Sequence, residues 1–397
     1  MIWLNFLHFY QPANTEFYNI KTALDKSYWR LIRLLEEHPQ LRMTANISGC
    51  LLERLEDAGE TNFLERLRVL VKKGRLELTG SAYYHGFLPL LPATEVARQI
   101  KDNLAILQKN FGKNFQPRGF FLPEMAYSEA VAKIVKRLGY EWIIVDEITR
   151  GDLKLGLDLR QRYRDQASGL RVIFRERDLS NAYPPDALLE ILKQSPEQKQ
   201  GQVPVQITAT DAELYGLRHE DPTGEMEKIA KEKRIKTMTI SSYLDQLPKK
   251  LNSVKLVASS WESSPKELSQ NNPYSLWQNK NNKIQLELWK LANFALSLDK
   301  KYRRDKNYAW YRWHLSRGLA SCTFWWASAH DFSQEFGPFA WSPDEIERGV
   351  GDLVRSVRAL NSLTSKKDKL AAERQSIKIR KLIWETHWQK YWHQVYE

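Results

Sequence analysis

The stretch RGFFLPEMAYS, residues 118–128, contains an apolar run that ends directly before an acidic side chain. The three residues at 120–122 are typical of a buried β-strand, Pro123 ends that strand, and Glu124 follows. A helical pattern begins near Ser128, a residue type that suits a helix N-cap. This order of strand, acid and helix predicts one unit of an α/β fold, with Glu124 at the carboxyl end of its strand.

Similar short apolar segments recur over the first two thirds of the 397-residue chain, and helical patterns such as 27–38, 62–74 and 94–112 lie between several of them. The expected strands are 2–8, 42–47, 75–79, 118–122, 140–146, 170–174, 203–209, 237–240 and 254–259. Repeated strand–helix units predict a parallel sheet with helices outside it. Seven or more such units within about 260 residues favour a barrel over an open sheet.

The pattern changes after Pro273, where long helical stretches are expected at 274–298, 306–328, 343–363 and 366–393. The third of these has a clear start, because Ser342 suits an N-cap and Pro343 suits the first helical position. We therefore expect a catalytic barrel over residues 1–265 and a helical domain over residues 266–397.

The amino-acid composition is that of a globular protein with many aromatic side chains. Hydrophobic residues make up 42% and charged residues 27% of the chain, which is ordinary for a globular protein. Fourteen Trp and seventeen Tyr are more unusual, and their rings offer flat faces to ligands such as sugars. The net charge of +12 is dispersed along the chain, which favours a solvated basic surface, so no nucleic-acid partner is expected.

The start of the chain and the cysteine content indicate a cellular location. The segment 1–12 is apolar, but it has no basic region before it and no small-residue cleavage site, so we interpret it as a first strand. No later run is long enough to span a membrane. With only two cysteines, Cys50 and Cys322, the sequence predicts a cytoplasmic protein without a membrane partner.

Polar and aromatic side chains follow many of the expected strands. In a parallel barrel the carboxyl ends of the strands share one face, and catalytic residues gather there. In chain order these side chains include His8 and Gln11, His85, Glu124, Arg175, Arg177 and Asp178, Asp211 and Glu213, and Trp261. These residues predict a polar cleft lined with aromatic rings.

Two of these candidates have the chemistry of a glycosidase. Retaining hydrolysis of a glycosidic bond needs a carboxylate nucleophile and a protonated carboxyl acid about 5–5.5 Å apart. Glu124 and Asp211 follow different strands, so a barrel can bring them across a cleft. As the acid, Asp211 would need a raised pKa. The sequence has no glycine-rich phosphate loop and no GxSxG motif with a usable His and Asp.

Five segments in order resemble the motifs of glycoside hydrolase family 57, and the resemblance covers most of the chain. They are HFYQP (8–12), GRLELTGSAYYHGFLPLLP (74–92), FFLPEMAYS (120–128), DAELYG (211–216) and CTFWWASAHDF (322–332). The resemblance implies a distorted (β/α)7 barrel followed by helices, a retaining mechanism, α-glucan-type substrates and no obligatory cofactor.

The resemblance also implies roles for individual residues. Glu124 takes the place of the family nucleophile and Asp211 that of the general acid/base. The expected substrate-binding residues are His8, Gln11, His85, Glu213, Trp261, Trp325 and Trp326, the last two contributed by the helical domain. The chain departs from the family at Tyr10, where many members have His, and at Arg218, where His is frequent. These departures concern substrate binding, so hydrolysis, glucan transfer and branching all stay open.

Two other classes of protein stay open at this stage. A metal-dependent polysaccharide deacetylase uses a related barrel, but it needs an Asp and two His ligands, typically at H-x-x-x-H spacing. None of the eight His residues has that spacing, so no metal site is expected. The other class is a noncatalytic carbohydrate-binding relative, against which the retained carboxylate pair argues.

Overall fold

The computed structural model describes residues 1–151, 156–194, 203–329, 332–333, 337–338 and 340–391. The chain forms two compact units. The first consists of Met1–Tyr83 and Leu88–Trp261, and the second of Tyr84–Phe87 and Glu262–Glu397. The short segment Tyr84–Phe87 thus belongs to the second unit although barrel sequence surrounds it.

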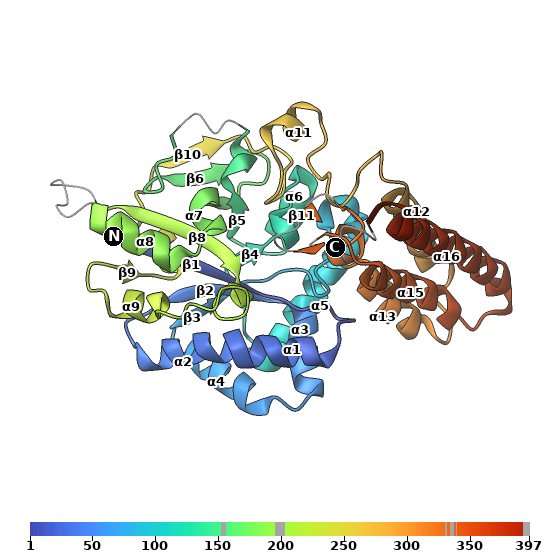
Figure 1. Ribbon diagram of the computed structural model, residues 1–397, viewed down its shortest axis with the longest axis horizontal. Coiled ribbons are helices and arrows are strands. Elements are labelled where there is room, and N and C mark those ends of the chain that lie inside the picture. The colour runs from blue at the N-terminus through green and yellow to red at the C-terminus, as the bar shows by residue number, and fades with distance from the viewer. Residues whose placement is uncertain (152–155, 195–202, 330–331, 334–336, 339, 392–397) are drawn as a thin grey trace. The chain divides into compact units, whose positions relative to one another are not determined.

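In the described residues, seven strands of the first unit form a parallel barrel (Figure 1). They are β1 (Ile2–Phe9), β2 (Met43–Ile47), β3 (Leu76–Leu78), β4 (Gly119–Phe121), β5 (Trp142–Asp146), β7 (Arg171–Arg175) and β8 (Val205–Asp211). Parallel pairing joins β3, β2, β1 and β8 in that order, and β4, β5 and β7 in a second series.

Two contacts between these series close the ring. A parallel bridge between Gly80 and Phe120 extends β3 onto β4. The backbone nitrogen of Glu176, directly after β7, donates to the carbonyl oxygen of Ile207 in β8 at 2.9 Å. The predicted (β/α)7 barrel is therefore confirmed, with each backbone edge paired to its neighbour.

Three further strands lie at the edges: β6 (Arg162–Asp165), β9 (Lys236–Thr237) and β10 (Leu251–Val254). The sequence did not predict β6, because its letters RYRD have no apolar alternation. The strand expected at 254–259 has the wrong bounds, because β10 ends at Val254. After it, the backbone of Val257 donates to Thr149, and Ser259 makes only an isolated bridge with Tyr127, so residues 255–259 join no sheet.

Helices cover the outside of the barrel, with α2 and α4 together on one side in Figure 1. They are α1 (Phe17–Ala23), α2 (Trp29–Glu37), α3 (Gly49–Asp57), α4 (Thr61–Lys72), α5 (Ala93–Phe111), α6 (Glu129–Arg137), α7 (Arg177–Asn181), α8 (Pro184–Gln194), α9 (Glu225–Lys231) and α10 (Ile240–Gln246). The helices expected at 27–38, 62–74 and 94–112 are confirmed as α2, α4 and α5. A π-helical segment, Leu24–Tyr28, joins α1 to α2 without a break.

The alternation of side chains along β1 separates two apolar cores. Trp3 and Leu7 pack outward against the helices, in one cluster of buried residues. Leu4 and Phe6 point into the barrel, where they pack with Phe121 and other strand residues. Each fully buried large apolar side chain stabilises the fold by about 1.5–3 kcal/mol. Because the barrel interior is filled, polar chemistry is restricted to its ends.

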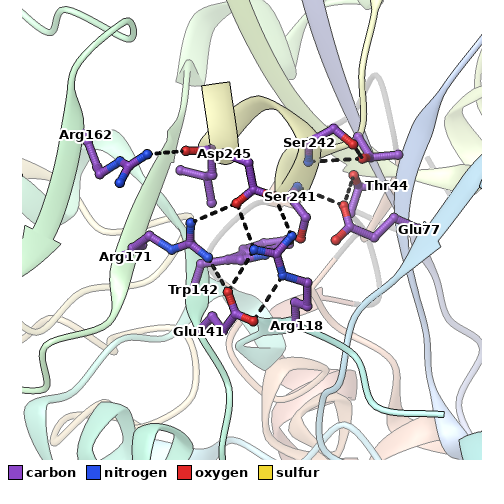
Figure 2. A network of polar contacts seen from close by, with 12 residues as sticks. Thr44, Glu77, Arg118, Glu141, Trp142, Arg162, Arg171, Ser241, Ser242 and Asp245 are labelled. Carbon is purple, nitrogen blue, oxygen red and sulfur yellow. Dashed lines mark hydrogen bonds and ion pairs between the residues drawn. The ribbon is translucent and has the colours of Figure 1, made fainter. Parts of the chain in front are cut away.

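The amino end of the barrel carries a network of ion pairs, which Figure 2 shows. Arg118 donates to Glu141 at 2.9 Å and to Asp245 of α10 at 2.7 Å. Arg171 contacts the same two carboxylates. The network joins the starts of β4, β5 and β7 to α10. Since most of these side chains are more than a third exposed, each pair contributes about 1 kcal/mol or less.

The second unit is helical, as predicted. Its described helices are α11 (Pro265–Ser269), α12 (Lys283–Lys301), α13 (Tyr308–Gly318), α14 (Ser321–Trp325), α15 (Pro343–Ala359) and α16 (Lys366–Thr386). Ser342 caps α15 as expected, accepting from the backbone of Glu345. The stretch expected at 306–328 is interrupted at 319–320, between α13 and α14. Within the described residues, no helix has the length and apolar character needed to cross a membrane.

Candidate active site

Five inward-facing side chains form a polar layer at the carboxyl end of the barrel: His8, Asn46, Asp146, Arg175 and Asp211. In the strand register, His8 of β1 lies beside Asn46 on one side and Asp211 on the other. The layer lies directly above the apolar interior because side chains of one strand alternate between its two faces. This is the face on which catalytic residues of barrels gather.

His8 lies between the strands that carry the two candidate catalytic residues. Its Nδ1 is 2.9 Å from Oδ1 of Asn46, and its ring centroid is 4.6 Å from that of Phe121 in β4. Burial lowers the pKa of His8 to about 4, although the nearby charge of Asp211 acts in the other direction. His8 is therefore a neutral imidazole near pH 7, suited to hydrogen bonding in the site.

Glu124 directly follows β4 and has an unusual backbone conformation. Its φ of 58° and ψ of 19° lie in the left-handed region, which costs a residue other than glycine about 1–3 kcal/mol. Trp261 holds it at two points: the indole Nε1 donates to Glu124 Oε2 at 2.8 Å, and the Trp261 backbone nitrogen donates to the Glu124 carbonyl oxygen at 3.1 Å. The predicted site residue Trp261 thus contacts Glu124 directly.

Asp211 ends β8, and its carboxylate accepts a hydrogen bond from Arg218 at 2.7 Å. Its side chain keeps 41% of its surface exposed at the open end of the barrel. Burial by the surrounding protein raises the pKa of Asp211, but the positive charge and hydrogen bond of Arg218, together with the charge of Arg175, outweigh it, and the pKa is lowered. The prediction that Asp211 has a raised pKa is therefore wrong, and Asp211 is ionised in the resting site.

Glu213 is the neighbour of Asp211 in the same segment and differs from it in protonation. It is almost fully buried, and its Oε1 accepts hydrogen bonds from Gln11 Nε2 at 2.8 Å and from the hydroxyl of Tyr28. Burial, together with the charge of Asp211, raises the pKa of Glu213 to about 7. The predicted residue Gln11 is thus placed to hold Glu213.

Asp146 and Arg175 complete the polar layer. The sequence analysis placed Arg175 at a strand end but gave it no role in the site, and it did not select Asp146. Arg175 Nε donates to Asp146 Oδ2 at 2.7 Å, and its NH1 group donates to the carbonyl oxygen of Ala209 at 3.0 Å. Arg177 also donates to Asp146, at 3.0 Å. Asp146 is the last residue of β5 and Arg175 the last of β7, so the strand-end signal that selects Asp211 also applies to both.

Three predicted site residues lie in the second unit. His85 is buried with φ 56°, and its Nδ1 is 2.9 Å from Oγ of Ser321. Trp325 is the last residue of α14 and Trp326 follows it as the C-cap, with the two ring centroids 4.6 Å apart. Their contact with substrate stays a prediction, as does the 5–5.5 Å separation of the catalytic carboxyl groups.

The arrangement of possible metal ligands was compared with what a bound metal ion requires. Within the part of the chain that the structure describes, no group of three or more His, Cys, Asp or Glu side chains is arranged to hold a metal ion.

Comparison with solved structures shows the same architecture. The 4-α-glucanotransferase from Thermococcus litoralis superimposes with a TM-score of 0.73 at 19% identity, over 91% of this chain and 60% of that one. A family 57 branching enzyme from Thermococcus kodakaraensis gives a TM-score of 0.68 at 16% identity, over 95% of each chain. At these identities the likeness is one of fold.

Sequence comparison identifies the family. An α-amylase from Pyrococcus furiosus is 30% identical over 143 residues, which cover 36% of this chain and 21% of that protein. This chain therefore matches only about a fifth of the length of that relative. The sequence profile described as Glycosyl hydrolase family 57 matches residues 5–256, which run from within β1 to just past the end of β10. The chain belongs to glycosyl hydrolase family 57.

Proposed function

We propose that this protein is a retaining enzyme that acts on α-glucans, with Glu124 as nucleophile and Asp211 as general acid/base. The observation that carries the proposal is the conformation of Glu124, which the two hydrogen bonds from Trp261 hold in the left-handed region at the end of β4. Strained backbone at a barrel's carboxyl end is typical of a functional residue. Family membership and the names of the relatives support the choice of α-glucans.

In the first half of the reaction, a carboxylate oxygen of Glu124 attacks the anomeric carbon. The bond to the leaving sugar breaks, and the leaving oxygen takes a proton from the acid/base group. A glycosyl ester on Glu124 results. The indole of Trp261 fixes the direction of the carboxylate during this step, since its donor contacts one of the two oxygens.

In the second half, the acid/base group takes a proton from an acceptor hydroxyl, and that oxygen displaces Glu124 from the anomeric carbon. Water as acceptor gives hydrolysis, and a sugar hydroxyl gives transfer or branching. The predicted neutral imidazole of His8, beside Asp211, is suited to contact the sugar bound there.

The test is product analysis with a defined maltooligosaccharide and with glycogen, using Glu124→Gln as control. New reducing ends indicate hydrolysis, longer oligosaccharides without new ends indicate transfer, and α-1,6 linkages indicate branching. Absence of all three with a well-folded protein contradicts the proposal and favours a noncatalytic carbohydrate-binding role.

We further propose that the protein works in the cytosol on an oligosaccharide or polysaccharide, without a nucleic-acid partner. The two cysteines, Cys50 and Cys322, are not joined by a disulfide bond, which supports a reducing compartment. Fractionation of the source cells, followed by detection with an antibody, tests the location.

A further inference from the structure

The helical run after β1 contains an irregular turn at Leu24–Tyr28, which is π-helical between α1 and α2. Ser27 and Tyr28, consecutive residues of this turn, are both fully buried. Short π-helical turns inside α-helices are frequent at functional sites. This turn faces the segment Asp211–Gly216, which carries the candidate acid/base.

Three consecutive residues of the π-helical turn contact that segment. Ser27 Oγ donates to the carbonyl oxygen of Ala212 at 2.5 Å, and the Tyr28 hydroxyl donates to Glu213 Oε1. A Cβ atom on Gly216 would lie 2.3 Å from the carbonyl oxygen of Lys26, so only glycine allows this close approach. The turn therefore fixes the backbone of the segment and, through Tyr28, one carboxyl group on it.

The charges around the two carboxyl groups give them opposite protonation states. In the described residues, Arg218 from the following loop, His8 of β1, Arg175 of β7 and Tyr28 face the pair. Arg218 and Arg175 favour ionised Asp211 through their positive charges. Burial and the charge of Asp211 raise the pKa of Glu213 to about 7, so Glu213 is neutral below that pH.

The hydrogen bonds to Glu213 indicate which oxygen carries the proton. Gln11 and Tyr28 both donate to Oε1. Burial raises the pKa of Tyr28 well above its usual value, so Tyr28 remains a donor. With both donors on Oε1, the proton of a neutral Glu213 belongs on Oε2.

We propose that Asp211 and Glu213 share the single proton used in the acid step, that Glu213 holds it in the resting enzyme, and that Tyr28 is a positioning residue which sets how firmly it is held. The proposal rests on the proposed function. The shared proton passes to the leaving oxygen as the glycosidic bond breaks and its electron pair moves to that oxygen. The acceptor hydroxyl returns a proton to the pair as the ester on Glu124 is displaced.

The hydroxyl of Tyr28 stabilises the ionised form of Glu213, because it donates to a carboxylate more strongly than to a neutral acid. Removing the donor in Tyr28→Phe should make the pair keep its proton to higher pH. The basic limb of the pH profile of kcat/KM, which reports loss of the acid from the free enzyme, should then move to higher pH.

Ser27→Ala is the matched control. It removes the contact of the same turn with Ala212 but leaves the contact with Glu213 intact. Both variants should lower the melting temperature, but only Tyr28→Phe should move the basic limb. Equal movement in both variants, or no movement in Tyr28→Phe, overturns the proposed role of Tyr28.

A measurement without substrate locates the proton itself. Infrared spectra of the substrate-free enzyme near pH 6 contain a protonated carboxyl band, which should shift when glutamate carries ¹³C and disappear in Glu213→Gln. The spectrum of Glu213→Gln must be subtracted from that of the wild type, because burial also raises the pKa of Glu176 to about 7 and its carboxyl group can contribute to the band. A band that shifts with ¹³C-aspartate instead, or that survives in Glu213→Gln, overturns the proposal. If the spectra are as expected but the protein has no activity on any glucan, the proposed function is refuted while the position of the proton on Glu213 stands.

Discussion

The indole Nε1 of Trp261 donates a hydrogen bond to Glu124 Oε2 at 2.8 Å, although the two residues are 137 positions apart in the chain. Trp261 also bonds the carbonyl oxygen of Glu124 through its backbone nitrogen. One residue therefore holds both the left-handed backbone and the carboxylate of the proposed nucleophile. Trp261 acts in this way as an orienting group, in addition to any stacking against sugar.

Replacement of Trp261 by Phe tests this role, because Phe keeps a ring but lacks the indole donor. A hydrogen bond to a charged group contributes about 1.5–3 kcal/mol, so kcat/KM should fall about 10- to 150-fold. The backbone bond persists, and the melting temperature should change little. Steady-state kinetics on a maltooligosaccharide measure the effect, and an unchanged kcat/KM would contradict an orienting role.

Replacement of Glu124 by Gln removes the nucleophile but keeps the shape of the side chain and one hydrogen-bond acceptor. Turnover should fall by several orders of magnitude because no glycosyl ester can form. Circular dichroism should show an unchanged fold. Near-normal turnover in a folded Glu124→Gln protein would remove Glu124 from the mechanism.

Replacement of Asp211 by Asn tests the acid/base through the leaving group. A poor leaving group needs a proton and should react far more slowly, whereas an activated aryl glycoside, which leaves without one, should be much less affected in the first step. Glu213→Gln is the matched variant, since Glu213 lies in the same segment. Equal slowing of both substrates by Asp211→Asn would assign the proton transfer elsewhere.

His8 should make the stability of the protein depend on pH. Its pKa is about 4 in the folded protein and near 6.5 when unfolded, so below pH 6.5 the unfolded chain binds the proton more readily. The free energy of unfolding should therefore fall as the pH drops from 6.5 towards 4, by up to about 3 kcal/mol from this residue.

Denaturant unfolding of the wild type and of His8→Gln between pH 4 and pH 7 measures this contribution. The difference in stability between the two proteins should shrink as the pH falls, because Gln does not titrate. A difference that stays constant over this range would show that His8 is not held neutral by the fold.

Removal of divalent metals should leave activity unchanged. The expectation comes from the histidine spacing, which does not fit the ligand set of a metal-dependent deacetylase. Activity is measured after dialysis against EDTA and after addition of Zn²⁺. A stoichiometric metal lost together with activity, and restored with it, would favour the deacetylase class.

Local sequence patterns were sufficient to predict the barrel and the face that carries the site. Glu124 and Asp211 could be selected because each follows an apolar strand, and the end of a buried strand is visible in the sequence. The same rule placed Arg175 at a strand end without giving it a role, and it was not applied to Asp146, the final residue of β5. The pattern also placed a strand at 254–259, whereas β10 ends at Val254, since apolar residues cannot reveal whether a partner strand is adjacent.

The order of strands and helices, and the functional groups at the strand ends, follow from the amino-acid sequence. Which of the two acids, Asp211 or Glu213, is ionised depends on the folded structure. Arg218 and His8 lie against Asp211, whereas Glu213 is buried against Tyr28 and Gln11. Protonation depends on burial and on charges a few ångströms away in space, and neighbouring positions in a chain can differ in both.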